Sequence, residues 1–299
     1  MRRRFVTLDV FTTRRFAGNP LAVVLEADKL DGASMQAIAR EFNLPETVFV
    51  SAAVDSAHRA KLRIFTPATE LPFAGHPTVG TAVLLARIDG GTTPREIVLE
   101  EGLGPIRCTA EPDACDGGQA RFAVPRLPEH VGETADASDV AAALGLQLDD
   151  LGCDDFEPGR WSAGLEFSMI PVRGLDAIGR SRCDLTRWEA GFGSAGPGMA
   201  YAFCRETTEA GHAFHARMFA PRMGIPEDPA TGSAAAAFAG LIACHAGLAD
   251  GEHTLAIEQG YEMGRPSLIG LALTLRNGAL AAASIGGHAV LVTEGTIEA

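Results

Sequence analysis

Residues 65–88, FTPATELPFAGHPTVGTAVLLARI, and residues 219–242, FAPRMGIPEDPATGSAAAAFAGLI, follow one pattern. They align without a gap, so that Phe65 falls on Phe219, and each passes through a Gly/Pro/Thr loop into an Ala-rich apolar helix. A single repeat 154 positions apart predicts two related domains rather than a solenoid of short units. If two such halves face each other, two helix N-termini meet at one cleft, where free N–H groups and positive dipole ends favour an anion.

The bulk composition predicts a well-folded protein of two domains. The chain has 299 residues, 46% of them apolar and 21% charged, and a net charge of −13. This acidic balance argues against nucleic acid or an anionic membrane as the main partner, since both need a basic footprint, but it allows a positive pocket for an acidic metabolite. The six cysteines form no CxxC pair, and the longest apolar stretch, residues 234–249, reads as a core helix. We therefore expect a cytoplasmic protein.

The secondary-structure pattern is α+β, with many short strands and few helices. A Rossmann or barrel fold is disfavoured, because strands and helices alternate one for one in those folds. Helices are expected at residues 34–42 with Ser34 as N-cap, 77–88 with Pro77 at the first helical position, 137–144, 185–190 and 231–246. Strands are expected at residues 5–11, 21–26, 47–52, 60–65, 96–101, 106–110, 120–124, 166–172, 200–204, 213–219, 253–258, 268–275 and 288–292.

The Asp/Gly-rich stretch at residues 111–119, EPDACDGGQ, is the best candidate for a connection between the domains. We expect a first domain of residues 1–115, to which the last strand at about 288–299 returns, and a second domain of residues 116–287. Each domain then contains one copy of the repeat.

Three polar residues that interrupt apolar sequence are candidates for chemistry. Glu46, in NLPETVFV, precedes a strand that enters a core, where a partly desolvated carboxylate suits a general base; the alternative is an exposed turn residue. His76, in FAGHPTVG, lies at the helix mouth of the first domain, either in a site or as a capping or packing histidine. Asp228, in EDPATGSA, occupies the equivalent mouth in the second domain, or is a turn residue ahead of Pro229.

Small residues in the two loops complete the candidate site. Gly75, Gly232 and Ser233 fit a close backbone approach to an anion and a hydroxyl contact, although a turn glycine often has no other role. His212 and His215 form an HxxH, but in a strand this spacing puts them on opposite faces, so we expect no metal pair. The sequence has no GxSxG, Walker or HExxH motif.

Five motifs run in order through essentially the whole chain: DVFTTRRFAGNPLAVV, NLPETVFV, TPATELPFAGHPTVGTA, EDPATGSA and EQGYEMGRPS. In this combination the chain resembles the phenazine-biosynthesis PhzF-like family. That family is similar in fold to diaminopimelate epimerase. The resemblance therefore implies two pseudo-symmetric domains, each a curved mixed sheet wrapped around a central helix, as the internal repeat requires.

The resemblance also implies a mechanism. In the epimerase each helix mouth carries a catalytic cysteine, and the aligned positions here are Ala74 and Asp228, so a two-cysteine racemisation is unavailable. What is implied instead is a single-base isomerase in which Glu46 shuttles a proton, with His76 and Asp228 beside the substrate. The substrate-binding residues that the resemblance implies are Asn19, Gly75, Gly232 and Ser233.

The implied reaction moves a proton between two carbons of an unsaturated, carboxylate-bearing ring, and the best-known family substrate is trans-2,3-dihydro-3-hydroxyanthranilate. Such a shift needs a base and donors aimed at the developing charge, but no metal, flavin or nicotinamide, so we expect no cofactor. The expected protein is a homodimer that binds a small carboxylate, and neither nucleic acid nor a membrane.

Pro45 departs from the phenazine-pathway pattern, which has a serine before the base. Proline removes a hydroxyl and a backbone N–H from the site, which bears on the substrate more than on the reaction type. Two alternatives stay open: another epimerase or lyase on the same scaffold, and a non-catalytic metabolite-binding protein. The joint presence of Glu46, His76, Asp228 and Ser233 argues against the second, since a decayed site is expected to lose at least one of them.

Overall fold

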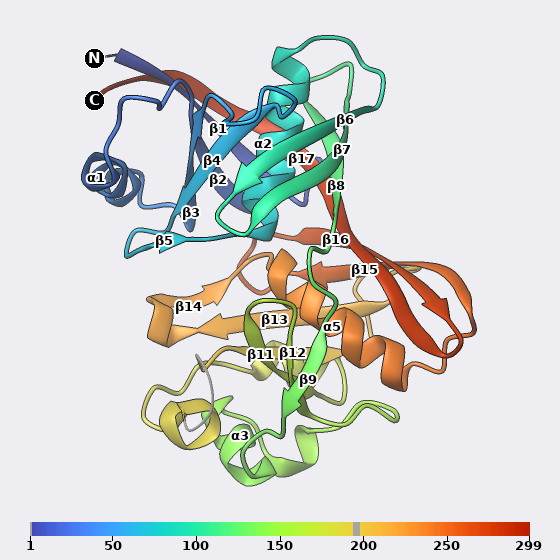
Figure 1. Cartoon of the computed structure of the whole chain (residues 1–299). Helices are drawn as coiled ribbons and strands as arrows, with labels where there is room; N and C mark the ends of the chain where they lie inside the picture. The colour runs from blue at the N-terminus through green and yellow to red at the C-terminus, as the bar shows by residue number, and fades with distance from the viewer. Residues whose placement is uncertain (1, 194–197) are drawn as a thin grey trace. The chain divides into compact units, whose positions relative to one another are not determined.

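The computed structural model describes residues 2–193 and 198–299 and divides into two compact units. Unit 1 comprises Met1–Ala123 with Gly286–Ala299, and unit 2 comprises Val124–Ile285. Both contain many strands and few helices, as the sequence predicts (Figure 1). Within the described ranges, no helix is long and apolar enough to cross a bilayer.

Unit 1 is organised around one helix. Its elements are β1 (Arg2–Val10), β2 (Asn19–Val24), α1 (Gly32–Phe42), β3 (Glu46–Ser51), β4 (Ala60–Phe65), β5 (Glu70–Leu71), α2 (Gly75–Ile88), β6 (Arg95–Glu101), β7 (Gly104–Pro112) and β8 (Gly117–Ala123). The last strand, β17 (Ala279–Glu298), pairs antiparallel with β1, which also pairs with β2. Helix α2 is buried from Gly75 to Ala86 and packs against β1, β2, β3, β6, β7 and β8 (Figure 1).

A glycine allows α2 to pack closely against the sheet. A Cβ at Gly80 would lie 2.7 Å from side-chain carbons of both Val10 and Leu21. A larger residue there would force the Val10 and Leu21 side chains or the helix to shift. The position of the α2 N-terminus relative to the start of β2 therefore depends on Gly80.

Unit 2 repeats this organisation with additional short elements. Its elements are β9 (Glu129–Gly132), α3 (Ala137–Ala143), β10 (Gly159–Ser162), β11 (Glu166–Pro171), α4 (Leu175–Arg180), β12 (Ala200–Cys204), β13 (Phe214–Ala220), β14 (Ile225–Asp228), α5 (Gly232–His245), β15 (Gly251–Gln259) and β16 (Ser267–Arg276). Helix α5 is buried from Ala234 to Ile242 and packs against β9, β10, β11 and β16.

The two units share one strand-pairing scheme. β2 is parallel to β3, as β11 is to β12, and β3 is antiparallel to β4, as β12 is to β13. A short strand, β5 or β14, then pairs antiparallel with β4 or β13 and leads into α2 or α5. After the helix, β6 or β15 returns parallel to β4 or β13. The order and direction of pairing are thus the same on the approach to each helix and on the return from it.

The stretch at residues 111–119 does not connect the two units. It forms the turn of the β7–β8 hairpin within unit 1, and the chain passes into unit 2 at Val124. The turn is closed by the Asp113 carboxylate, which accepts hydrogen bonds from the backbone N–H groups of Cys115 at 2.8 Å and Gly117 at 3.1 Å. The Asp and Gly residues that suggested a linker are therefore hairpin-turn residues.

Helix ends differ most from the expectations. Helix α1 begins at Gly32, with Asp31 rather than Ser34 as N-cap, because the Asp31 carboxylate accepts from the Ser34 N–H at 2.8 Å. Helix α2 begins at Gly75, two residues before Pro77. Around residues 185–190 the structure has no α-helix element but a short π-helix at Glu189–Gly193. The short helix α4 was not expected.

Candidate functional site

In unit 1, three element starts bring the predicted residues together. Glu46 is the first residue of β3 and is paired in register with Leu21 of β2. His76 is the second residue of α2, and its Nε2 lies 3.3 Å from Glu46 Oε2. The side chains are 5% exposed for His76 and 12% for Glu46. The predicted base and the predicted helix-mouth histidine are therefore direct neighbours in a nearly dry environment.

The His76 ring is neutral. Burial lowers the pKa of His76 to about 3, against a smaller opposite effect of a hydrogen bond to the Pro20 backbone. Pro20 has no N–H, so its carbonyl accepts this bond from the ring, and the nitrogen that donates carries the single proton of neutral imidazole. Nε2, which faces Glu46, then carries a lone pair. The 3.3 Å contact between His76 Nε2 and Glu46 Oε2 is close but does not have the geometry of a hydrogen bond.

The N-terminus of α2 has no side-chain cap. Its N-cap is Ala74, and the first helical hydrogen bond runs from Thr78 N–H to the Ala74 carbonyl at 3.3 Å. The N–H groups of Gly75 and His76 precede that bond and lie at the positive end of the helix dipole. Asn19, fully buried, begins β2 next to Pro20.

In unit 2, Asp228 and the start of α5 form a second polar cluster. Asp228 is the last residue of β14 and is 6% exposed; its Oδ2 accepts from Thr231 Oγ1 at 2.6 Å. Gln259 Nε2 donates to the Asp228 carbonyl at 2.8 Å and to Thr231 Oγ1 at 3.0 Å. Gln259 Oε1 accepts from the Thr231 N–H at 3.1 Å. These bonds fix the chain that leads into α5.

The N-terminus of α5 also lacks a side-chain cap. Its first helical bond runs from Ala235 N–H to the Thr231 carbonyl at 3.0 Å, so the N–H groups of Gly232 and Ser233 precede it. The Ser233 side chain is half-buried in this first turn. Gly232 and Ser233 thus occupy the place in unit 2 that Gly75 and His76 occupy in unit 1.

This equivalence corrects the gapless alignment of the repeat. The strands before the loops keep the offset of 154, but the helix starts Gly75 and Gly232 are 157 positions apart. The extra length includes a turn of 3₁₀-helix at Pro221–Met223, which the first copy lacks. Ala74 therefore corresponds to Thr231, not to Asp228.

The structure also revises the reading of the two histidines. His212 precedes β13, which begins at Phe214, so the opposite-face argument does not hold. Both rings contact one carboxylate, with Nδ1 of His212 and Nδ1 of His215 each 2.7 Å from Glu258. Among the residues that the structure describes, no group of three or more His, Cys, Asp or Glu side chains is arranged to hold a metal ion.

Four residues beneath the helix starts were missed: Thr78, Glu101, Thr231 and Gln259. A signal for two of them was present, because EEG at residues 100–102 and EQG at residues 258–260 follow the two copies of the repeat. EQG opens the motif EQGYEMGRPS, but a three-residue match does not indicate that its middle residue lies beneath a helix start.

Comparison with known proteins gives consistent results. The family model described as "Phenazine biosynthesis-like protein" matches residues 8–295. A protein named "uncharacterized isomerase" from Mesorhizobium japonicum is 49% identical over 302 residues, covering 99% of this chain and 98% of the relative. The trans-2,3-dihydro-3-hydroxyanthranilate isomerase of Pseudomonas aeruginosa is 35% identical over 270 residues, 88% of each chain. The crystal structure of a Bacillus anthracis phenazine biosynthesis protein of the PhzF family matches with a TM-score of 0.90 at 25% identity, over 100% of both chains.

Proposed function

Because this chain belongs to the phenazine biosynthesis-like family and is an isomerase, we propose that it moves a proton between two carbons of a small, unsaturated carboxylate, with Glu46 as acid and base. The observation that carries this proposal is the buried contact between Glu46 and the neutral imidazole of His76. A carboxyl group that is nearly dry and lies beside a proton acceptor can both accept and return a proton.

The proposed proton transfer is balanced within the substrate. Glu46 as carboxylate takes a proton from one carbon, and the electron pair of that C–H bond moves into the unsaturated system. Glu46 as carboxylic acid then returns the proton to a second carbon on the same face. Negative charge that develops on the substrate is stabilised by the N–H groups of Gly75 and His76 at the positive end of α2.

The remaining predicted residues are assigned to substrate binding. We propose that Asn19 contributes its amide in unit 1. Gly232 and Ser233 contribute N–H groups and a hydroxyl at the start of α5, as Gly75 does at the start of α2. Asp228 is held by Thr231 and is proposed to orient a polar group of the substrate.

The proposed substrate resembles trans-2,3-dihydro-3-hydroxyanthranilate, the compound in the name of the relative from Pseudomonas aeruginosa. Pro45 gives the site neither a hydroxyl nor an N–H at the position before the base. We therefore expect slower turnover of this compound than by a relative with serine there.

The test is an isomerisation assay with this compound on three proteins: the natural chain, Glu46→Gln and Glu96→Gln. Glutamine keeps the shape of glutamate but cannot carry the proton, so Glu46→Gln should lower kcat by roughly 10²-fold or more, with binding largely kept. Glu96, whose side chain is 62% exposed, is the matched control and should have no effect.

Two outcomes contradict the proposal in different ways. An unchanged kcat in Glu46→Gln would remove Glu46 from the mechanism. No turnover by the natural chain would reject this substrate, and mass spectrometry of the metabolite that co-purifies with the protein would then identify the acid that is bound.

We further propose that each unit is a curved mixed sheet wrapped around its helix, and that the units are pseudo-symmetric copies. The shared pairing scheme and the burial of α2 and α5 support this. Superposition of the two units in a crystal structure tests it, and helices that fail to overlap would contradict it. The homodimer remains a prediction, which light scattering on the purified protein tests.

A further inference from the structure

The carboxyl group of Glu101 is buried beneath the N-terminal turn of α2, and the proposed proton transfer does not use it. Glu101, the last residue of β6, is 8% exposed, and its Oε1 lies 2.8 Å from Thr78 Oγ1. The same Thr78 oxygen lies 2.7 Å from the Ala74 carbonyl. Side chain, hydroxyl and backbone thus form a chain from Glu101 to the N-cap of the helix that carries His76.

The number of protons available to these two hydrogen bonds shows which protonation state of Glu101 fits them. A carbonyl only accepts, so the contact with Ala74 takes the single hydroxyl proton of Thr78. The contact between Thr78 and Glu101 then needs a proton from Glu101, which is possible only for the carboxylic acid. The second carboxyl oxygen, Glu101 Oε2, is buried and has no hydrogen-bond partner, which is costly for a carboxylate and tolerable for a neutral acid.

We propose that Glu101 is a positioning residue that, as a neutral carboxylic acid, holds Thr78 and through it the N-terminal turn of α2 in the geometry that substrate binding needs. This inference rests on the proposed function of Gly75 and His76. Burial raises the pKa of Glu101 to about 8. At neutral pH the acid form therefore dominates, in agreement with the proton count.

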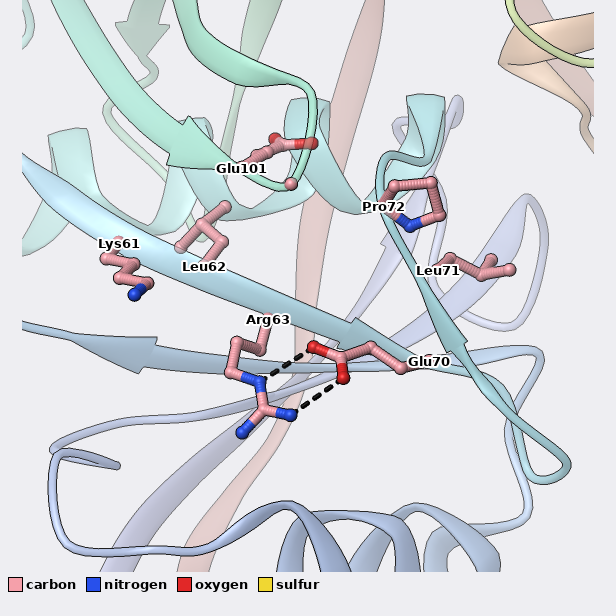
Figure 2. Close-up of a pocket in the computed structure, with 8 residues that line it drawn as sticks. Lys61, Leu62, Arg63, Glu70, Leu71, Pro72 and Glu101 are labelled. Atoms are coloured by element: carbon pink, nitrogen blue, oxygen red, sulfur yellow. Dashed lines mark hydrogen bonds and ion pairs between the residues drawn. The ribbon is translucent and has the colours of Figure 1, made fainter.

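The groups around Glu101 can be named element by element. Thr78 faces it from α2 and the Cys108 thiol from β7, where burial and the Glu101 charge raise the pKa of that thiol. A cavity of about 560 Å³ borders Glu101 and is also lined by Lys61 and Arg63 of β4. Figure 2 shows the Arg63 guanidinium bound by both oxygens of Glu70.

This cavity gives Glu101 a route to exchange its proton. The Arg63 charge is matched by Glu70 of β5, and Lys61 is a second cation on the cavity wall. Water in a cavity of this size can reach the exposed part of Glu101. The acid can therefore equilibrate with solvent and titrate as pH rises.

The second unit supports the assignment independently. In β15, Ile257 pairs with Phe214, as Leu99 of β6 pairs with Ala60, so Gln259 stands where Glu101 stands. Gln259 also bonds the residue at the N-cap of its helix, Thr231, through both its N–H and its hydroxyl. A neutral amide thus does in unit 2 what we assign to a neutral acid in unit 1.

The test compares pH profiles of kcat/KM for the natural chain, Glu101→Gln and Glu101→Ala. Glutamine is neutral at every pH and can donate to Thr78, so Glu101→Gln should retain activity near neutral pH and lose the decline that the natural chain shows above about pH 8. Glu101→Ala should lower kcat/KM roughly tenfold at all pH values, on the scale of one lost hydrogen bond in a buried site. An alkaline decline that persists in Glu101→Gln would overturn the proposal.

A readout without substrate separates this proposal from the proposed function. The backbone ¹H–¹⁵N signals of Thr78 and His76 should shift with a midpoint near pH 8 in the natural chain and stay constant in Glu101→Gln. Glu96→Gln, on the same strand but exposed, should behave as the natural chain. Signals that do not titrate in the natural chain between pH 6 and 10 would overturn the proposal even if isomerase activity is confirmed.

Discussion

The two units keep the same support beneath their helices and differ in what the helix starts present. In unit 1 the start of α2 presents His76 beside Glu46, 3.3 Å away. In unit 2 the start of α5 presents Ser233, with Asp228 bonded to Thr231. Under the proposed function, the acid/base chemistry is assigned to unit 1, and the helix start of unit 2 is assigned to binding.

Both units contain the same hydrogen-bonded turn, which is held by Glu100 in unit 1 and by Glu258 in unit 2. The Glu100 carboxylate accepts from two consecutive backbone N–H groups and contacts a histidine; the residues are Val54, Asp55 and His58. Glu258 does the same with Thr208, Glu209 and His212, each 154 positions further along the chain. Such a detailed repeat supports the proposal that the two units are pseudo-symmetric copies.

The largest effect among variants of the two helix starts is expected for His76→Asn. It removes the acceptor that faces Glu46 in a buried site, so kcat/KM should fall roughly 10- to 100-fold, through both binding and turnover. Because burial lowers the pKa of His76 to about 3, the ring is neutral between pH 5 and 9. The fall should thus be the same across that range, as steady-state kinetics at several pH values can show.

Ser233→Ala is the counterpart of that variant in unit 2. It removes one half-buried hydroxyl and no proton acceptor, so it should raise KM by less than about tenfold and leave kcat nearly unchanged. A loss of kcat in Ser233→Ala as large as in His76→Asn would break the assignment of chemistry to unit 1.

An intermediate effect is expected for Gln259→Glu, which places in unit 2 the carboxyl group that Glu101 has in unit 1. Gln259→Glu replaces the N–H donor that faces the Asp228 carbonyl and should cost about 1–3 kcal/mol, the scale of a buried unsatisfied polar group. Burial raises the pKa of a carboxyl group in the folded protein. The variant is therefore more stable at low pH, and this stability is lost as pH rises through the raised pKa. Thermal unfolding should show a larger drop in Tm at pH 9 than at pH 5.

In unit 1, removing the carboxyl group by Glu101→Gln should change the pH dependence of Tm in the opposite direction. The natural chain loses stability as pH rises from the ordinary value for glutamate to the raised pKa of Glu101, about 8. Glu101→Gln lacks this loss, so its Tm should exceed that of the natural chain at pH 9 by more than at pH 5. Equal differences at both pH values in Glu101→Gln and Gln259→Glu would show that neither site depends on a neutral group.

The smallest effect is expected for Glu100→Gln in the shared turn. Backbone N–H groups, with His58, lower the pKa of Glu100 to about 2, so its contribution to stability is present above the ordinary pKa and is lost as pH falls toward 2. Glu258 is fully buried and holds His215 as well as His212. Glu258→Gln should thus lower Tm more than Glu100→Gln at pH 7, as calorimetry can test.

Much of this organisation could be predicted from the sequence, because strand patterns and the two repeated motifs depend on local residues. The strands at residues 60–65 and 200–204 were predicted with their observed bounds. The helix starts could not be placed from the repeat alone. The second copy has three extra residues before its helix, so Thr231 rather than Asp228 corresponds to Ala74. The contact of Glu101 with Thr78 joins residues 23 positions apart, and short EEG and EQG motifs do not reveal such a contact.

Solvent exchange is the most direct test of whether Glu46 carries the proton. Trans-2,3-dihydro-3-hydroxyanthranilate is incubated in D₂O with the natural chain, Glu46→Gln or Asp228→Asn, and deuterium at carbon is followed by NMR. Glu46→Gln should slow incorporation by roughly 10²-fold or more, while Asp228→Asn at saturating substrate should exchange faster than Glu46→Gln. Incorporation at the natural rate in Glu46→Gln, with loss in Asp228→Asn, would contradict this role of Glu46 and make Asp228 the base.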